Sequence, residues 1–204
     1  MAEEEKKANN NIVWHHAVIT RHMRERLNEH KSVILWFTGL SGAGKSTLAH
    51  AVEEALYGMK VRTFVFDGDN VRHGLNKDLG FSRDDRKENL RRIAEMCRLF
   101  IEAGVIAMTA FISPYKQDRE MVKEIVGDDE FIEIFCKCSL DTCEKRDVKG
   151  LYARAKSGEI KEFTGVSAPY EVPENPAITI NTESKPLEEC VEEVVVFLKK
   201  KGII

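Results

Sequence analysis

The sequence contains no apolar run of the length that a membrane-spanning helix requires, and it has little net charge. Its 31 lysines and arginines nearly balance its 34 acidic residues, which leaves a formal charge of -3 at pH 7. Such a chain offers no electrostatic reason to expect a nucleic-acid or membrane partner. The first residues, MAEEEKK, also lack the basic and then hydrophobic order of a signal peptide. We therefore expect a cytoplasmic protein that binds any anion through local contacts.

Cysteine is scarce and irregularly spaced. The five cysteines are an odd number, which fits reduced thiols better than a disulfide framework. Cys136, Cys138 and Cys143 are close in sequence, but no histidine or CxxC pair completes a set of zinc ligands. Internal repeats are also absent. The 204 residues therefore predict one large domain, with or without a small appendage, and no structural zinc.

Apolar runs and longer amphipathic stretches alternate along the chain. The runs are mostly apolar on both faces, as strands of a buried parallel sheet are. The clearest helix spans about residues 84–103, and its start resembles a capping box of Ser82 and Asp85. The pattern predicts a three-layer α/β domain over residues 31–204, with ligands beyond the carboxyl ends of the strands. The expected strands are residues 33–38, 61–66, 105–111, 131–138 and 177–180.

Two segments do not fit this alternation. Residues 1–30 form a charged tail and then a short apolar pattern, which predicts a helix packed on the domain or on a second subunit. The apolar residues of that pattern are Val18, Ile19, Met23 and Leu27. Residues 149–175 are rich in lysine, glycine and proline, and a loop of this length in a compact domain is often a functional lid.

Residues 39–46 match the phosphate-loop pattern GxxxxGK[ST], between a predicted strand and a predicted helix. The glycines let backbone N–H groups face phosphate oxygens, and the start of the helix adds a favourable dipole. Lys45 is expected to reach the terminal phosphates, and Ser46 to ligate Mg²⁺. The predicted ATP-binding residues of this loop are Gly39, Leu40, Ser41, Gly42, Ala43, Gly44, Lys45, Ser46 and Thr47.

The phosphate loop alone leaves switches, motors and kinases as candidates. A guanine-nucleotide switch needs an NKxD loop, and residues 76–79 read NKDL instead. A motor ATPase needs an acidic residue at the end of a neighbouring strand and coupling segments for which this chain has no room. A kinase needs a second pocket, a carboxylate near the acceptor hydroxyl and positive charge for the transferred phosphoryl group.

Such acceptor-side groups follow the second predicted strand. Asp67 and Asp69 flank a glycine, where they are placed to hold water-bridged Mg²⁺ and to orient a hydroxyl group. A plain Asp-Gly turn is the alternative interpretation of the same residues. Arg72 and Arg86 are candidates for clamping an anionic acceptor, and Phe81 is a candidate for stacking on a base. The set favours a kinase over a non-catalytic nucleotide sensor, which does not need these carboxylates.

Blocks of sequence spread over nearly the whole chain narrow the choice among kinase families further. They are IVWH (12–15), WFTGLSGAGKSTLA (36–49), DGDNVRHGLNKDLGFS (67–82), FISPY (111–115), RDVKGLYARA (146–155) and FTGVSAPYEVPENP (163–176). Together with Arg86 and Asn89 they resemble the adenylylsulfate kinase (APS kinase) family, in its stand-alone bacterial form. Members of that family phosphorylate the ribose 3′-hydroxyl of adenosine 5′-phosphosulfate (APS). A P-loop kinase of another small acceptor, such as a nucleoside monophosphate or a sugar acid, is the alternative.

The resemblance implies roles at the matching positions. Asp67 and Asp69 would supply the metal-water and hydroxyl-orienting carboxylates, in an order that the sequence leaves open, and Asp67 joins Ser46 as the implied metal site. Phe81 and Phe163 would sandwich the APS adenine, and Arg146 would lie near the ATP adenine. The implied APS contacts are Asp69, Arg72, Phe81, Arg86, Asn89, Ile112, Ser113, Lys149, Gly150, Leu151 and Phe163.

Ser113 has two candidate roles in this scheme. In bacterial members of the family the matching serine is described as a phosphorylated intermediate, whereas direct in-line transfer needs no such group. We expect direct transfer, and we keep Ser113 in the catalytic set with Lys45, Asp67 and Asp69. The resemblance also implies a homodimer, with part of the contact in residues 14–27, and functional coupling to ATP sulfurylase.

Overall fold

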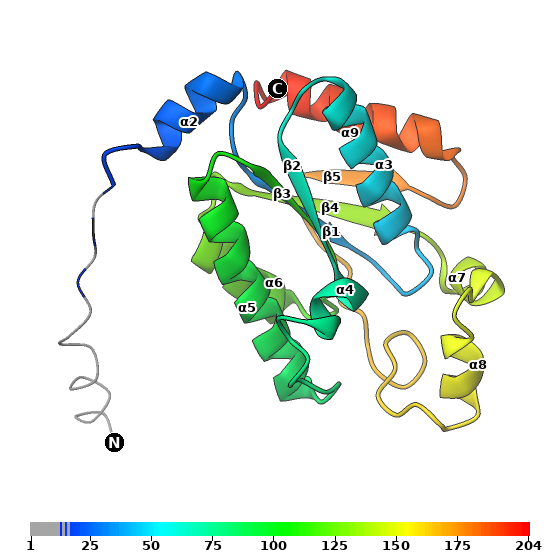
Figure 1. The fold of residues 1–204 in the computed structure, drawn as a ribbon. Coiled ribbons are helices and arrows are strands. Elements are labelled where there is room, and N and C mark those ends of the chain that lie inside the picture. Colours follow the sequence, from blue (N-terminus) through cyan, green and yellow to red (C-terminus); the bar gives the residue numbers. More distant parts are fainter. Residues whose placement is uncertain (1–12, 14, 16) are drawn as a thin grey trace.

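The computed structural model describes residues 13, 15 and 17–204. Its centre is a five-stranded parallel sheet in the order β2-β3-β1-β4-β5 (Figure 1). The strands are β1 (Ile34–Thr38), β2 (Thr63–Asp67), β3 (Ile106–Ala110), β4 (Phe131–Lys137) and β5 (Ile178–Asn181). All five expected strands are therefore present, and the predicted α/β fold is confirmed.

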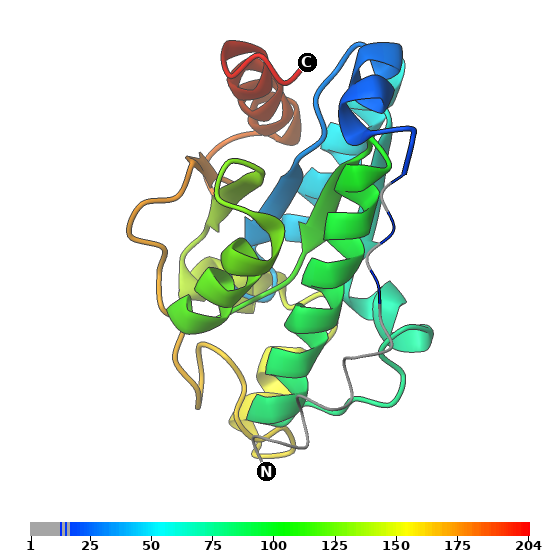
Figure 2. The same cartoon turned by 90° about the vertical axis from the view of Figure 1, so that its left-hand side faces the viewer.

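Helices cover both faces of the sheet. Helices α3 (Lys45–Gly58) and α9 (Leu187–Lys200) pack on one face, while α5 (Arg83–Glu102) and α6 (Lys116–Val126) pack on the other. Figure 2 looks onto α5 and α6, with the sheet behind them. The remaining helices of the described chain are α2 (Arg21–Asn28), α4 (Gly68–His73), α7 (Leu140–Arg146) and α8 (Leu151–Lys156).

The central strand β1 shows why the expected strands are apolar on both faces. Leu35 and Phe37 belong to the core that includes α3 and α9, whereas Ile34 and Trp36 belong to the core under α5 and α6. Successive side chains of a strand point to opposite faces, so a strand covered on both sides needs apolar residues throughout. Every residue of β1 is buried as a result.

Helix α5 begins where the sequence predicts, after Ser82. The Ser82 hydroxyl accepts a hydrogen bond from the Asp85 amide at 3.1 Å and donates one to the Asp85 carboxylate at 2.8 Å. The hydroxyl thus satisfies one of the unpaired N–H groups of the first turn. The carboxylate of Asp85 engages the serine side chain and not its amide, which differs from a full capping box.

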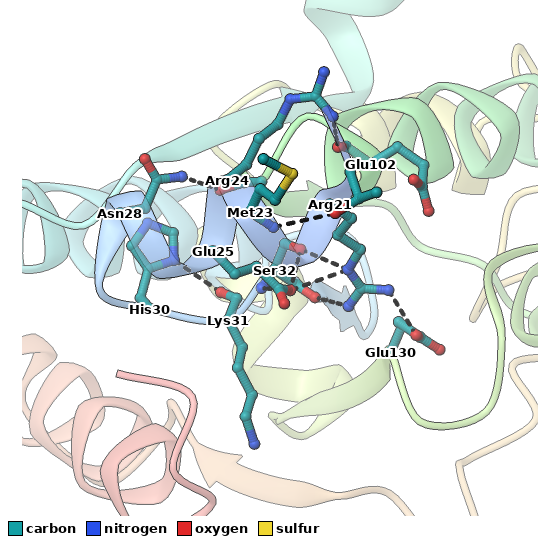
Figure 3. Close-up of polar contacts among 12 residues, drawn as sticks. Arg21, Met23, Arg24, Glu25, Asn28, His30, Lys31, Ser32, Glu102 and Glu130 are labelled. Carbon is teal, nitrogen blue, oxygen red and sulfur yellow. Dashed lines mark hydrogen bonds and ion pairs between the residues drawn. The ribbon is translucent and has the colours of Figure 1, made fainter. Parts of the chain in front are cut away.

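Helix α2 is attached to the domain by polar side chains (Figure 3). Arg21 donates to the Ser32 carbonyl oxygen at 2.6 Å and to Glu130 Oε1 at 2.7 Å, and Arg24 donates to the Glu102 carbonyl oxygen at 3.0 Å. The apolar pattern that predicted this helix is exposed instead of packed against the domain, at Val18, Ile19, Met23 and Leu27. Trp14, at the start of the expected dimer contact, lies outside the described residues.

All five cysteines are free thiols. Burial raises the pKa of Cys136 and of Cys143 to about 12, so both remain protonated at neutral pH. In the described part of the chain, no group of three or more His, Cys, Asp or Glu side chains is arranged to hold a metal ion. Within residues 13, 15 and 17–204, each helix is too short or too polar to span a bilayer.

Candidate active site

The loops that follow β1, β2 and β3 meet at one edge of the sheet. In the strand register, Ala110 at the end of β3 lies beside both Phe37 of β1 and Asp67 of β2. The chain segments that leave these strands are the phosphate loop, the turn after Asp67 and the turn that contains Ser113. Figure 1 shows α4, α7 and α8 grouped around this edge. The predicted site segments are therefore brought together, as the switch-point rule for open α/β sheets requires.

The phosphate loop needs glycine at two positions because neighbouring backbone lies close behind it. A Cβ atom at Gly39 would lie 2.7 Å from the Cys136 carbonyl oxygen, and one at Gly42 would lie 2.9 Å from the Cys143 carbonyl oxygen. Gly42 also has a φ of 77°, a conformation that residues with a side chain rarely adopt. The loop leads directly into the amino terminus of α3, which is favourable for a bound anion.

Lys45 is the first residue of α3 and is buried. Its ammonium group donates to the Leu40 carbonyl oxygen at 2.7 Å, within the phosphate loop. Burial lowers the pKa of Lys45 to about 8, and the nearby Asp67 opposes this lowering. The charged form is therefore poorly solvated until an anion reaches it. The following residues, Ser46 and Thr47, are exposed.

The two predicted carboxylates have different surroundings. Asp67 caps α4, and its Oδ1 accepts from the Asp69 amide at 3.0 Å. Asp69 forms an ion pair through Oδ2 with Lys149, which comes from the predicted lid. The next helix of the lid contacts the phosphate loop, because the Tyr152 hydroxyl donates to the Ser41 carbonyl oxygen at 2.9 Å. The lid thus touches both the phosphate loop and the carboxylate turn.

Phe81 presents an exposed ring between two arginines. The residue is 67% exposed, and the guanidinium carbons of Arg72 and Arg86 lie 4.5 and 5.9 Å from the centroid of its ring. Burial lowers the pKa of both arginines, and the charge of Arg86 lowers the pKa of Arg72 further. Two partly desolvated cations beside an exposed aromatic residue favour an anion attached to a planar base.

Arg86 also connects this ring to the lid. It donates to the Phe81 carbonyl oxygen at 2.8 Å and to the Glu162 carbonyl oxygen at 3.4 Å. Phe163, the other expected partner of the adenine, is buried and packs edge-on against Tyr152 at a centroid distance of 5.0 Å. Its ring is therefore not open to a base in the way that the Phe81 ring is.

Ser113 lies in a buried hydrogen-bond network. Its hydroxyl accepts from Trp36 Nε1 at 3.0 Å and donates to Thr38 Oγ1 at 2.9 Å. The Thr38 hydroxyl donates in turn to the Ile112 carbonyl oxygen at 2.8 Å and lies 3.0 Å from the Tyr170 hydroxyl. Ser113 is only 3% exposed, and its hydroxyl already has two hydrogen-bond partners. The hydroxyl is therefore poorly placed for attack on ATP.

Asn89 is buried within α5. Its side-chain oxygen accepts from Asn76 Nδ2 at 3.0 Å, which ties the loop after α4 to the helix. The contact of Asn89 with APS stays a prediction.

Arg146 and the loop after β5 border the phosphate loop on its other side. Arg146 donates to the Gly42 carbonyl oxygen at 3.3 Å and to the Thr182 carbonyl oxygen at 2.8 Å. The Thr182 hydroxyl donates to the Ala43 carbonyl oxygen at 2.9 Å. These contacts bring Arg146 to the phosphate loop, and its place near the ATP adenine stays a prediction.

The neighbouring Glu183 holds the start of α7, the helix that carries Arg146. Its carboxylate accepts from the Thr142 hydroxyl at 2.5 Å, the Ser139 amide at 2.9 Å and the Ser139 hydroxyl at 2.8 Å. These bonds, with that of Thr142 foremost, lower the pKa of Glu183 to about 2. Sequence reasoning missed the roles of Thr182 and Glu183, which no motif marks, and of Tyr152 and Tyr170, which lie in the blocks 146–155 and 163–176 but were given no role there. Their only signal is a position in the lid or after a strand end.

A parallel sheet whose central strand leads into a phosphate loop and a buried lysine defines the protein as a member of the P-loop nucleotide-binding class. The family model for adenylylsulphate kinase matches residues 31–181. The adenylyl-sulfate kinases of Acaryochloris marina and Staphylococcus haemolyticus are 59% and 57% identical over 194 residues, which cover 95% of this chain and 95% and 98% of theirs. The chain belongs to the adenylylsulphate kinase family.

A solved structure agrees with this assignment. An APS kinase of Mycobacterium tuberculosis in complex with AMPPNP and APS has a TM-score of 0.80 and 42% sequence identity. The similarity covers 83% of this chain and 99% of that one. The enzyme class predicted from the phosphate loop and the acceptor-side residues is thereby confirmed.

Proposed function

We propose that the protein transfers the γ-phosphate of ATP to the 3′-hydroxyl of APS, giving 3′-phosphoadenosine 5′-phosphosulfate (PAPS) and ADP. Membership of the adenylylsulphate kinase family supports the reaction. The observation that carries the choice of acceptor is the exposed ring of Phe81 flanked by Arg72 and Arg86. A nucleotide with an anionic 5′-substituent offers this pocket both the base and the charge that it can bind.

On the donor side, the phosphate loop binds the triphosphate through its backbone N–H groups. Lys45 is placed to neutralise charge on the transferred phosphoryl group. Its own charge is buried and poorly solvated when no phosphate is bound. Ser46 and Asp67 fit the requirements of Mg²⁺, since Ser46 is exposed and Asp67 keeps one carboxylate oxygen free of its capping bond. When bound with ATP, Mg²⁺ would neutralise charge on the phosphate oxygens.

On the acceptor side, Asp69 is the proposed residue that orients the 3′-hydroxyl. Its present partner is Lys149, so APS binding requires this ion pair to open or to shift. Lys149, Gly150 and Leu151 begin the lid, and its closure would bring Phe163 toward the second face of the adenine. The remaining proposed APS contacts are Arg72, Phe81, Arg86, Asn89, Ile112 and Ser113.

Transfer is proposed to be direct, with Ser113 as a structural member of the site. A phosphorylated serine would place a charged group in the buried network of Trp36 and Thr38, where little water can solvate it. We further propose a cytoplasmic homodimer that receives APS from ATP sulfurylase. The free thiols fit this location, and the exposed apolar residues of the segment that includes α2 fit a contact between subunits.

A coupled assay for ADP release tests the proposed reaction. With Mg-ATP present, APS should stimulate ADP release and yield PAPS, while AMP and gluconate should leave the rate at its background level. AMP shares the base and ribose but lacks the sulfate, and gluconate represents sugar-acid acceptors. Stimulation by AMP or gluconate to the level of APS would replace the proposed function by the kinase of another small acceptor.

A further inference from the structure

The first turn of α6 contains two charged residues that are buried, Asp118 and Arg119, with exposed fractions of 1% and 5%. Charged side chains at such depth are rare unless they are paired. In the described part of the chain, their side-chain hydrogen-bond partners all lie outside α6. The two residues therefore join α6 to other segments.

Asp118 holds the beginning of α5. Its carboxylate accepts two hydrogen bonds from the guanidinium of Arg83, at 2.5 and 2.9 Å, and the same guanidinium lies 4.0 Å from the centroid of Tyr115. Arg83 is the first residue of α5, between Phe81 and Arg86 in the sequence. A bidentate arginine–carboxylate pair fixes orientation as well as distance. Asp118 thus sets the position of the chain that carries the acceptor pocket.

Arg119 holds two further segments together. It donates to the Ser113 carbonyl oxygen at 2.8 Å and to the Glu171 carbonyl oxygen at 2.8 Å. Ser113 has a φ of 39°, which is unfavourable for a residue with a side chain and persists only where its surroundings hold it. The Glu171 amide donates to the Pro114 carbonyl oxygen at 2.8 Å, so the end of the lid segment is bound to the same turn.

The charge of Arg119 is compensated from the sheet. Its Nε lies 2.8 Å from Glu133 Oε1 in β4. Burial raises the pKa of Glu133, and the charge of Arg119 opposes that rise. The two terminal nitrogens of the guanidinium thus donate hydrogen bonds while Nε lies in ion-pair distance of Glu133, an arrangement that a lysine ammonium cannot reproduce with its single point of charge.

We propose that Asp118 and Arg119 are positioning residues for the acceptor of the kinase. This role rests on the function proposed above. The two residues orient three segments, namely the start of α5, the turn at Ser113 and the lid end at Glu171. In the described residues, neither side chain donates to or accepts from the phosphate loop. Loss of these contacts should weaken the use of APS and spare the binding of ATP.

Arg119→Lys is the first test, because it keeps a positive charge opposite Glu133. We expect KM for APS to rise about tenfold or more, as for the loss of charge-assisted hydrogen bonds, while KM for ATP stays within about twofold. Hydrogen exchange should become faster at the Glu171 amide and remain unchanged in the phosphate loop. Asp118→Asn should likewise raise KM for APS and leave KM for ATP nearly unchanged, because it weakens the contact with Arg83 at the start of α5.

Arg21→Lys is the matched control. Arg21 also joins a carbonyl oxygen and a carboxylate, those of Ser32 and Glu130 (Figure 3), but α2 lies at the opposite end of the sheet from α4, α7 and α8 (Figure 1). This variant should leave both KM values unchanged even where it lowers the melting temperature. An equal effect of Arg119→Lys and Arg21→Lys on KM for APS would assign Arg119 to general stability and overturn the proposal.

Two further outcomes separate this inference from the proposed function. If Arg119→Lys raises KM for ATP as much as KM for APS, the positioning role on the acceptor side is wrong although the kinase assignment stands. If the wild-type protein does not use APS, the proposed function fails. Hydrogen exchange at the Glu171 amide of Arg119→Lys needs no substrate, so it still tests whether Arg119 holds the turn at Ser113 and the end of the lid together, and unchanged exchange would reject this role.

Discussion

Replacing Lys45 by methionine should make the nucleotide-free protein more stable while it abolishes turnover. Burial lowers the pKa of Lys45 from 10.5 to about 8, which corresponds to about 3 kcal/mol against its charged form. Methionine fills a similar volume and carries no charge, but it loses the hydrogen bond to the Leu40 carbonyl oxygen, a loss of about 1 to 2 kcal/mol. The expected gain in the free energy of unfolding at pH 7 is therefore on the order of 1 kcal/mol.

The pH dependence of this gain has a defined sign. Below pH 8, Lys45 is charged in the folded and the unfolded protein, and the full burial cost is present. Between pH 8 and pH 10.5, the unfolded chain retains a proton that the folded protein has lost, so wild-type stability rises with pH relative to the variant. The advantage of Lys45→Met should therefore shrink as pH increases through this window.

Urea unfolding without nucleotide at pH 7 and at pH 9.5 measures both effects, with Lys145→Met as a control. Lys145 is exposed on α7, so its replacement should change stability little at either pH. The rate constant for single-turnover transfer from ATP to APS should meanwhile fall. The loss should correspond to a rise of at least roughly 3 kcal/mol in the activation barrier, as expected when a group that stabilises the transition state is removed. The reasoning is wrong if Lys45→Met is less stable than the wild type at pH 7, or if its difference from the wild type is the same at both values of pH.

Three other predictions concern separate parts of the site. Phe81→Ala should lower kcat/KM for APS by roughly ten- to a hundredfold and leave KM for ATP almost unchanged, whereas equal losses would mean that the ring belongs to the wrong pocket. Ser113→Ala should retain substantial turnover but lower stability by about 1 to 3 kcal/mol, because Trp36 Nε1 loses its acceptor; ATP-derived label on Ser113 that discharges to APS at the turnover rate would refute this. Glu183→Gln should be less stable than the wild type above about pH 4.5, and the difference should vanish as the pH approaches 2, since protonation then removes the same acceptor from the wild type.

The fold and the outline of the site follow from local sequence patterns. Strands buried on both faces are continuous apolar runs, and polar residues that come directly after them must lie at the carboxyl edge of the sheet. This places Lys45, Asp67 and Ser113 together without any knowledge of tertiary contacts. The conformation of the phosphate loop is equally local, because its glycines are required by the backbone itself.

The contacts that complete the site join segments that are distant in sequence, and no periodic pattern reports them. The roles of Arg119 depend on partners in β4, in the turn after β3 and at the end of the lid segment. The apolar pattern before residue 28 predicts a helix but not its mode of attachment, because Arg21 and Arg24 bind Glu130, in the turn before β4, and Glu102, at the end of α5. Similarly, the lid contains buried anchors at Tyr152 and Phe163, which its polar composition conceals.

The strand order has a consequence for synthesis of the chain. Central strand β1 pairs with β3 and β4 and not with β2, the next strand along the sequence, so Ile34 lies beside Ala107 and Phe131. Pairings between such distant residues require the closure of long loops, which slows folding relative to proteins built from local contacts. A nascent chain that has reached only β3 presents one edge of β1 without a partner, and its apolar surface is open to aggregation until β4 is complete. Stable folding of this enzyme should therefore await translation of β4, which ends at Lys137, and fragments that end before residue 137 should depend on chaperones to remain in solution.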